Sequence, residues 1–315
     1  MRPRTESTAV ILRRVNYAQL LFPDFSLILC GYLLCRYTAL NRTVWEQIER
    51  LVYFFLFPVL LFHSIVRSPL DFAAASSLIA AGLALGVSGI ALAYALPWLP
   101  WLGRRIDARR HAGAAQVAFR FNSFVGLALV DRLAGPPGLL LLAVLIGFCV
   151  PLFNIGAVWP MARHAKRNLL AELLRNPLII ATLGGLLLNL LGFRIPDWLS
   201  PTVTRISAAS LALGLMAAGA GLQLSGLARA RSLSVAILTI KHLLMPLVAL
   251  GLSLVFGLSA LQTLVLLAFS ALPTSPSSYV LAARMGYDGA YVAGLVTLST
   301  LLGLLSLPFA LGVLR

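Results

Sequence analysis

At residues 270–279 the chain reads Ser-Ala-Leu-Pro-Thr-Ser-Pro-Ser-Ser-Tyr, inside an apolar stretch that is otherwise long enough to cross a membrane. Pro273 and Pro276 each remove a backbone donor and clash with the preceding turn, so a continuous helix is not expected here. The carbonyl groups that they free cannot face lipid, and the break must line a cavity or be buried in protein. Four hydroxyl side chains lie at the same place: Thr274, Ser275, Ser277 and Ser278.

A helix that begins after Pro276 would direct its unpaired amides and its positive end into such a cavity, which suits an anion. The alternative is a simple proline kink in which the serines bond their own backbone. We favour a binding site, because six proline or hydroxyl residues in one short window exceed what a kink requires.

Composition extends the membrane interpretation to the whole chain. Of 315 residues, 60% are hydrophobic and 11% are charged, whereas a soluble domain carries about 25% charged residues. The mean hydropathy is +0.92. Apolar residues form runs such as 76–99 and 139–158, which match the thickness of the hydrocarbon core. We therefore predict an all-α polytopic membrane protein, with the lipid bilayer as its surroundings.

The net charge of +15 would suggest nucleic acid in a soluble protein. Here the basic residues gather in short connections between apolar runs, as at 104–110 and 163–167, which is typical of cytoplasmic loops. We expect no nucleic-acid partner. The connections on one side hold more Lys and Arg, which predicts an inner (plasma) membrane protein with both termini non-cytoplasmic.

Cysteine usage and the N-terminus are uninformative about chemistry. Cys30, Cys35 and Cys149 are odd in number and lack metal-ligand spacing, so we interpret them as packing residues. No metal or other cofactor is expected. The basic start of the chain is not followed by a cleavable signal sequence, and the first apolar run is expected to be a retained span.

Apolar runs separated by Pro, Gly or charge predict ten membrane spans. Their approximate ranges are 17–37, 49–66, 72–98, 112–133 and 138–161, followed by 177–193, 202–222, 232–256, 260–283 and 289–314. We divide the chain into a basic extension (1–16), a first five-helix repeat (17–163), a basic cytoplasmic hinge (164–175) and a second five-helix repeat (176–315).

The two halves resemble each other weakly. Ala118-Phe119 precedes Arg132, Gly135 and Gly138, and Ala268-Phe269 precedes Arg284, Gly286 and Gly289 at nearly constant offset. Because five spans is an odd number, two such repeats must lie inverted in the membrane, an arrangement found in many secondary carriers.

The fourth predicted span contains the counterpart of the proline-rich break, Arg120-Phe-Asn-Ser-Phe-Val-Gly126. An arginine deep in a span is costly and usually faces a cavity or a partner, so Arg120 is a candidate to neutralise a substrate carboxylate. The alternative is that Arg120 snorkels to the membrane surface. Asn122 and Ser123 add hydrogen-bonding groups, and Gly126 loosens the helix.

Other polar groups within or beside spans carry weaker signals. His63, Gln223 and Lys241 are candidates for a coupling or a structural role. The sequence Gly86-Val-Ser-Gly89 reads like that of an intramembrane serine protease, whose serine needs a histidine base. Close helix packing through small residues is the simpler interpretation, and we do not expect an enzyme.

The chain resembles the auxin efflux carrier family, which includes bacterial malate and malonate permease-like members. The strongest match is Ala271-Leu-Pro-Thr-Ser-Pro-Ser-Ser-Tyr-Val-Leu-Ala282, running into the tenth span and Leu307-Pro308. Supporting matches are Leu56-Phe-Pro-Val-Leu-Leu-Phe62, Asn122 with Gly126-Leu127, Arg175-Asn-Pro-Leu-Ile-Ile180 and Leu213-Gly-Leu-Met-Ala-Ala-Gly219.

The resemblance implies two inverted five-helix repeats whose fourth and ninth helices are broken and cross at the substrate site. It assigns Asn122, Pro273 and Pro276 to that crossover. The family often has Gly-Leu-Pro where this chain has Gly126-Leu127-Ala128, so the fourth helix is expected to bend at Asn122 and Gly126 alone.

We therefore predict a secondary transporter of a small organic anion such as a carboxylate, working by alternating access. The predicted substrate-binding residues are Arg120, Asn122, Ser123, Pro273, Thr274, Ser275, Pro276, Ser277 and Ser278. A homodimer is possible. The alternatives are a sodium-coupled bile-acid-like symporter and a non-transport membrane sensor or intramembrane enzyme.

Overall fold

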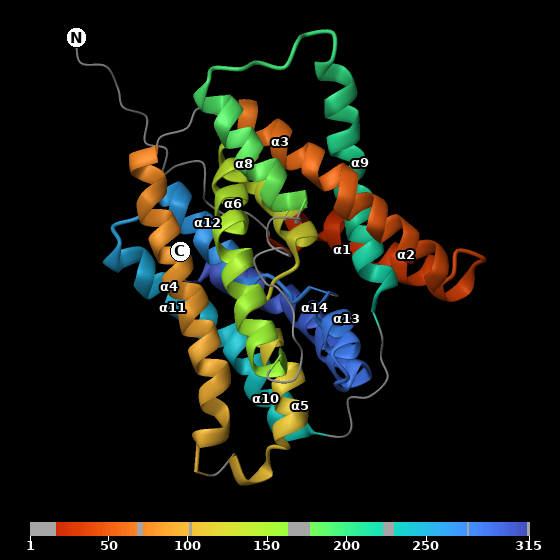
Figure 1. Ribbon diagram of the computed structural model, residues 1–315, viewed down its shortest axis with the longest axis vertical. Helices are drawn as coiled ribbons and strands as arrows, with labels where there is room; N and C mark the ends of the chain where they lie inside the picture. Colours follow the sequence, from red (N-terminus) through yellow and green to blue (C-terminus); the bar gives the residue numbers. More distant parts are fainter. Residues whose placement is uncertain are drawn as a thin grey trace.

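The computed structural model describes residues 17–67, 72–100, 103–162, 177–222, 230–275 and 277–313, and the regular elements in these ranges are all helical (Figure 1). The predicted N-terminal extension, the whole of the predicted hinge, Gln223 and Pro276 lie outside the described residues. In the first half the elements are α1 (Tyr17–Tyr37), α2 (Arg42–Leu51), η1 (Val52–Leu56), α3 (Phe57–Arg67), α4 (Phe72–Ala95), η2 (Leu96–Trp98), η3 (Gly103–Arg105), α5 (Ala108–Ala114), η4 (Ala115–Ala118) and α6 (Ser123–Ala162).

The second half continues with α8 (Pro177–Leu190), α9 (Ser200–Ala220), α10 (Arg231–Thr239), η6 (Ile240–Leu244), α11 (Met245–Val255), α12 (Ala260–Ala271), α13 (Ser277–Arg284) and α14 (Gly289–Gly312). Helix therefore occupies each of the ten predicted stretches. Within the described ranges, five helical segments are long and apolar enough by themselves to cross a membrane: Ser76–Trp98, Ala108–Met161, Ser200–Ala220, Arg231–Val255 and Gly289–Gly312. The inverted relation between the halves stays a prediction.

Two predicted ranges start too late, because polar caps begin the helices ahead of the apolar runs. The Oδ1 atom of Asn41 accepts hydrogen bonds from the amides of Thr43 and Val44, so the second helix begins at Arg42 rather than Glu49. Asp107 caps α5 by accepting from the amide of Arg110 over 2.7 Å, and that helix begins at Ala108.

Backbone irregularities occur where Gly or Pro requires them. Gly135 has φ of 57° inside α6, so α6 is two helices that meet at a sharp bend before Pro136. The π turns η1 and η6 are followed by Pro58 and Pro246. A proline provides no amide for the preceding turn and clashes with its carbonyl, and the helix widens there.

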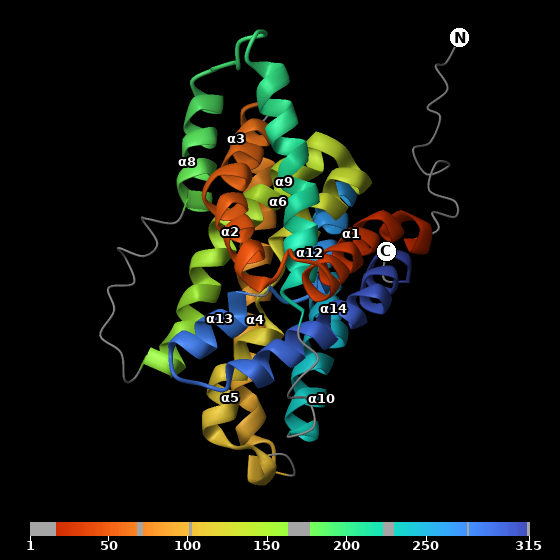
Figure 2. The ribbon, with the colours of Figure 1, turned by 90° about the vertical axis from the view of Figure 1, so that its right-hand side faces the viewer.

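The helices pack in two groups. In one group α1 contacts α9, and α3 contacts α8 and α9; in the other, α4, α6, α11, α12, α13 and α14 contact one another. Figures 1 and 2 show α8 and α9 at one end of the long axis, with α5 and α10 at the opposite end. The groups meet where α6 contacts α3, α8 and α9.

Glycine allows the closest of these helix contacts. A Cβ atom on Gly219 of α9 would collide with the carbonyl of Ile28, and one on Gly31 of α1 would collide with the carbonyl of Met216. Such small-residue contacts let helix backbones approach one another, as is common in membranes.

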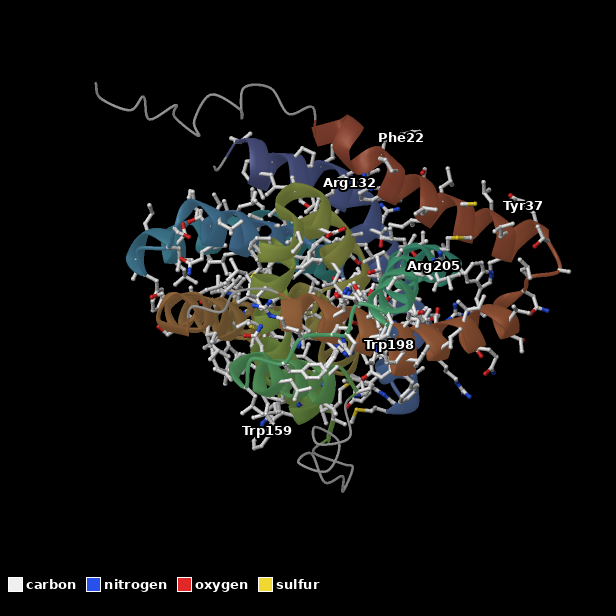
Figure 3. All side chains as sticks on the ribbon, turned by 90° about the horizontal axis from the view of Figure 1, so that it is seen from above. Phe22, Tyr37, Arg132, Trp159, Trp198 and Arg205 are labelled. Carbon is white, nitrogen blue, oxygen red and sulfur yellow. The ribbon has the colours of Figure 1, made fainter. Side chains whose placement is uncertain are left out.

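The outer surface carries large apolar side chains. Phe22 is 71% exposed, Tyr37 is 74% exposed and Trp159 is 67% exposed, and Figure 3 places all three at the edge of the molecule. An exterior of this kind suits contact with lipid, and aromatic side chains favour the membrane interface.

Candidate functional site at the crossing of two broken helices

The first helix break lies at residues 119–122, between η4 and α6. Asn122 begins α6 as its cap, since its Oδ1 atom accepts from the amides of Phe124 (3.0 Å) and Val125 (3.4 Å). The fourth helix is thus interrupted without a proline. Gly126 lies inside α6, so the expectation that it helps to bend the helix is wrong; a Cβ there would stand 2.7 Å from Cδ1 of Leu272.

The second break separates α12 from α13. Leu272 ends α12 with an extended ψ of 140°, and the next described residues before α13 are Pro273, Thr274 and Ser275. Ser275 prepares the start of α13, because its Oγ accepts from the amide of Ser277 and its carbonyl accepts from the amide of Ser278.

Three hydrogen bonds to backbone carbonyls join the segments around the two breaks. The amide of Asn122 donates to the carbonyl of Pro273 over 2.7 Å, and Oγ1 of Thr274 donates to the carbonyl of Val117 over 2.7 Å. The side-chain amide of Gln116 donates to the carbonyl of Ser278 over 3.1 Å. Backbone groups that the breaks release from their helices are thereby paired within the protein, as the membrane interior requires.

Arg120 extends to the crossing. Its Nη1 donates to Oε1 of Gln116 (3.0 Å), and its Nη2 contacts Oγ of Ser277 (3.2 Å) and Oδ1 of Asn154 (3.4 Å). The side chain is half-buried, and Ser277 is exposed. The guanidinium therefore lies beside the positive end of α13.

A buried chain of hydrogen bonds joins the second break to η6 and α14. The amide of Thr274 donates to Oγ of Ser299 over 3.0 Å. Ser299 contacts Nε2 of His242 at 2.9 Å, and Nδ1 of His242 contacts Ser306 at 2.8 Å. Ser306 in turn donates to the carbonyl of Ala271. His242 thus has a structural role, and its partners are two serine hydroxyls.

Some predicted residues belong to the crossing, and others lie elsewhere. Ser123 is the half-buried first residue of α6, and Ser278 is fully buried with a hydroxyl that has no hydrogen-bond partner in the described part of the chain. His63 contacts Ser207 at 3.3 Å, between α3 and α9. Lys241 is buried in η6 beside His242.

The protease interpretation finds no support in the geometry. The hydroxyl of Ser88 donates to the carbonyl of Ala84, one turn earlier in its own helix. Gly82 and Gly86 pack against α6, where added Cβ atoms would meet side chains of Leu145 and Leu152. The small residues of this segment therefore serve helix packing.

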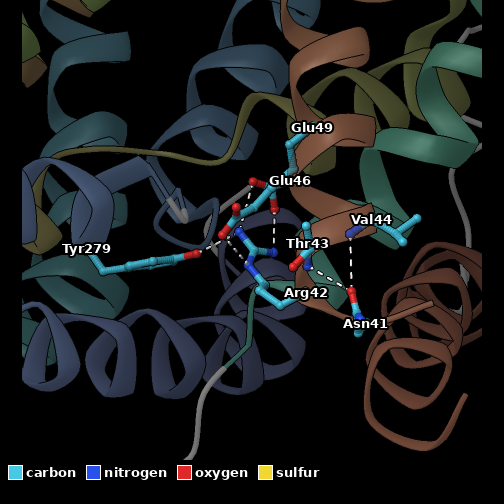
Figure 4. A network of polar contacts seen from close by, with 7 residues as sticks. All are labelled: Asn41, Arg42, Thr43, Val44, Glu46, Glu49 and Tyr279. Atoms are coloured by element: carbon cyan, nitrogen blue, oxygen red, sulfur yellow. Dashed lines mark hydrogen bonds and ion pairs between the residues drawn. The ribbon is translucent and has the colours of Figure 1, made fainter. Parts of the chain in front are cut away.

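A charged network reaches the crossing from α2 (Figure 4). Arg42 donates to both carboxylate oxygens of Glu49 (2.8 and 2.9 Å) and to the hydroxyl of Tyr279 on α13 (2.9 Å); Glu46 lies 3.6 Å from its Nε. Burial lowers the pKa of Arg42, but the bond to Glu49 and the neighbouring charges outweigh it and raise that pKa above its ordinary value. Arg42 therefore stays charged.

A membrane-embedded all-helical fold with two broken helices that cross is typical of membrane transporters. Residues 157–311 match the family model described as "Membrane transport protein", which represents the auxin efflux carrier family. The matched residues include the second break and its supporting helices. No curated protein matches the sequence.

Proposed function

We propose that the protein is a secondary transporter that binds a small organic anion, such as a carboxylate, at the crossing of its broken helices. The observation that carries this proposal is the position of Arg120, whose guanidinium lies 3.2 Å from Ser277 at the start of α13. A permanent cation beside a helix N-terminus is a favourable environment for a carboxylate.

Two further features of the crossing support a ligand there. Ser277 is exposed and offers a hydroxyl next to Arg120. Ser278 is buried, and its hydroxyl lacks a partner among the described residues. Buried polar groups in proteins are nearly always paired, so an orphaned hydroxyl marks a position where a ligand or water belongs.

The packing supports alternating access. We propose that the group that contains the crossing moves against the group formed by α1, α3, α8 and α9. In this mechanism the two repeats, 17–163 and 176–315, are inverted and joined by the cytoplasmic hinge 164–175, and both termini are non-cytoplasmic. Helix α2 packs against α9, a member of the group that includes α1, α3 and α8. The bond between Arg42 and Tyr279 therefore joins the two groups through α2 and α13, and it would have to open during such a movement.

Flux into proteoliposomes tests the proposal. Labelled malate, malonate and an indole carboxylate would be offered with and without imposed proton and sodium gradients. Saturable uptake of one of them by the native chain, and its loss in Arg120→Gln, is the expected result. Arg205→Gln, which removes an exposed charge from α9, is the matched control.

Three results would contradict the proposal. Folded protein that moves none of the three anions would exclude a carrier of this class of substrate. Uptake that Arg120→Gln leaves unchanged would exclude Arg120 as the anion-binding group. Uptake that strictly requires sodium would favour the bile-acid-like symporter instead.

A further inference from the structure

The π turn η6 places a lysine inside the protein. The side chain of Lys241 is 1% exposed, and its ammonium makes no hydrogen bond or ion pair with the residues that the structure describes. A lone charged group removed from water is costly unless a partner compensates for it. Met or Leu would fill the same space without the free-energy cost of removing a charge from water. Packing alone therefore does not explain a lysine at this position.

Among the described elements that pack against η6, none carries an acid that could compensate for the charge. The elements packed against this turn are α4, η4, α12 and α14 in addition to its own helix, and none of their sequences includes Asp or Glu. The titratable or charged groups on these elements are Tyr94, Tyr291, Arg231 and His242, and Arg120 follows η4 in the first break.

The turn contacts both helix breaks. On one side His242 contacts Ser299, which accepts the hydrogen bond from the amide of Thr274. On the other side Met245, one turn after Lys241, and Phe119 of the first break meet at Gly89, where an added Cβ would stand 2.9 and 3.0 Å from them. In addition, η6 itself packs against η4 and α12, the elements that precede the two breaks.

The turn is also a weak point of its helix. Pro246 provides no amide to the turn before it, and η6 adopts the wider π geometry. Single π turns are rare in proteins, and those that occur often lie at functional sites. Such a turn shifts the register of the side chains that it carries. A change in the register of η6 would therefore change the surroundings of the side chain of Lys241.

We propose that Lys241 is the group that binds and releases a proton during transport, so that one proton accompanies each carboxylate. This inference rests on the proposed function. With the site open to one side, Nζ takes a proton from water, and the resulting ammonium compensates for the negative charge of the bound anion. After the anion leaves on the other side, Nζ returns the proton to water there. The empty carrier then moves back with a neutral amine.

Proteoliposomes with a pH-sensitive dye inside test the inference, because anion entry and proton entry are measured together. The native chain is expected to accumulate the anion when the outside is acidic and to acidify the lumen as it does so. Lys241→Met is expected to lose both. Lys241→Arg, whose charge is permanent, is also expected to lose accumulation, and to keep more counterflow exchange than Lys241→Met, since exchange needs only the loaded carrier.

Arg231→Met, which removes an exposed cation from the same helix, is the matched control and is expected to keep proton-driven accumulation. If the native chain shows counterflow that does not respond to pH, proton coupling is excluded, but the proposed transport function is retained. Proton-driven accumulation that persists in Lys241→Met would overturn the role of Lys241 in coupling as well. The lack of any counterflow by folded native protein would overturn both the coupling and the proposed function.

Discussion

The backbone amide of Asn122 donates to the carbonyl of Pro273 over 2.7 Å, so the two helix breaks are joined through their main chains. The side chain of Asn122 caps α6 at the same time. One residue thus ends the first break and attaches it to the second, and Arg120, two positions earlier, is placed beside Ser277 as a consequence.

Replacement of Asn122 by Ala is expected to abolish transport while the protein remains folded. Loss of an N-cap costs about 1 kcal/mol, which leaves a folded chain but releases the start of α6 and the position of Arg120. Asn122→Ser keeps a capping oxygen and should retain part of the flux. Flux and detergent-solubilised stability would be measured together. Asn189→Ala removes a side-chain bond to the carbonyl of Val66, away from the crossing, and should transport normally. Normal flux by Asn122→Ala would refute this role.

Arg120→Gln is expected to weaken the apparent affinity for the anion roughly 10- to 100-fold, because a hydrogen bond to a charged group contributes about 1.5–3 kcal/mol. Arg120→Lys should be intermediate, since an ammonium lacks the planar fork that matches a carboxylate. Concentration dependence of initial uptake gives the affinities. Equal affinities for Lys and Gln variants would show that charge at this position is irrelevant.

Gly126→Ala is expected to impair transport by forcing Leu272 away from the crossing, because the new Cβ would stand 2.7 Å from Cδ1 of Leu272. Leu272→Val lacks that atom and should restore part of the loss in the double variant. A Cβ added at Gly251, in the middle of α11, would have no other atom within 4 Å. Gly251→Ala is therefore expected to be neutral or to stabilise the fold by up to ~1 kcal/mol. Impairment that Leu272→Val fails to relieve would mean that Gly126 acts through another contact.

Tyr279→Phe is expected to favour movement of the two helix groups, since it removes only the hydroxyl that accepts from Arg42. The bond from Glu49 to Arg42 remains in place. A charge-assisted bond of about 1.5 kcal/mol corresponds to a roughly tenfold shift between states. The rate at which a cysteine introduced at Ser277 reacts with a thiol reagent would report the shift, with the three native cysteines replaced. If the reaction rate of the introduced cysteine is unchanged, the hydrogen bond between Arg42 and Tyr279 does not restrain this movement.

Gly219→Ala is expected to destabilise the fold more than any of these changes, because its Cβ would collide with a backbone atom, the carbonyl of Ile28. Adding atoms to a well-packed core typically destabilises the fold by about 1–3 kcal/mol. A side chain can relieve such a collision by changing its rotamer, whereas a backbone carbonyl cannot. Thermal unfolding in detergent would measure the loss. Gly184→Ala in α8, with nothing within 4 Å, is the control. Equal melting temperatures would show that α1 and α9 have room to separate.

The sequence by itself determined the membrane class, the approximate helix positions and the proline-containing break, because apolar runs and the missing proline amide act locally. The family-model match over residues 157–311 confirmed the resemblance. Arg120, Asn122 and Thr274 lie close to one another at the crossing, and their part in substrate binding stays a prediction. The starts of α2 and α5 were misjudged, since Asn41 and Asp107 begin helices in polar sequence where hydropathy carries no signal.

Tertiary structure alone decided how the breaks are completed. Gln116 and Asn154 join Arg120 from other turns and helices, and Arg42 meets Tyr279 across 237 residues of chain. Gly126 is a packing position only because Leu272 lies against it. The isolation of Lys241 likewise depends on which helices surround η6. Hydrophobic periodicity and proline chemistry are properties of short segments, whereas pairing, burial and collision depend on which segments meet in space.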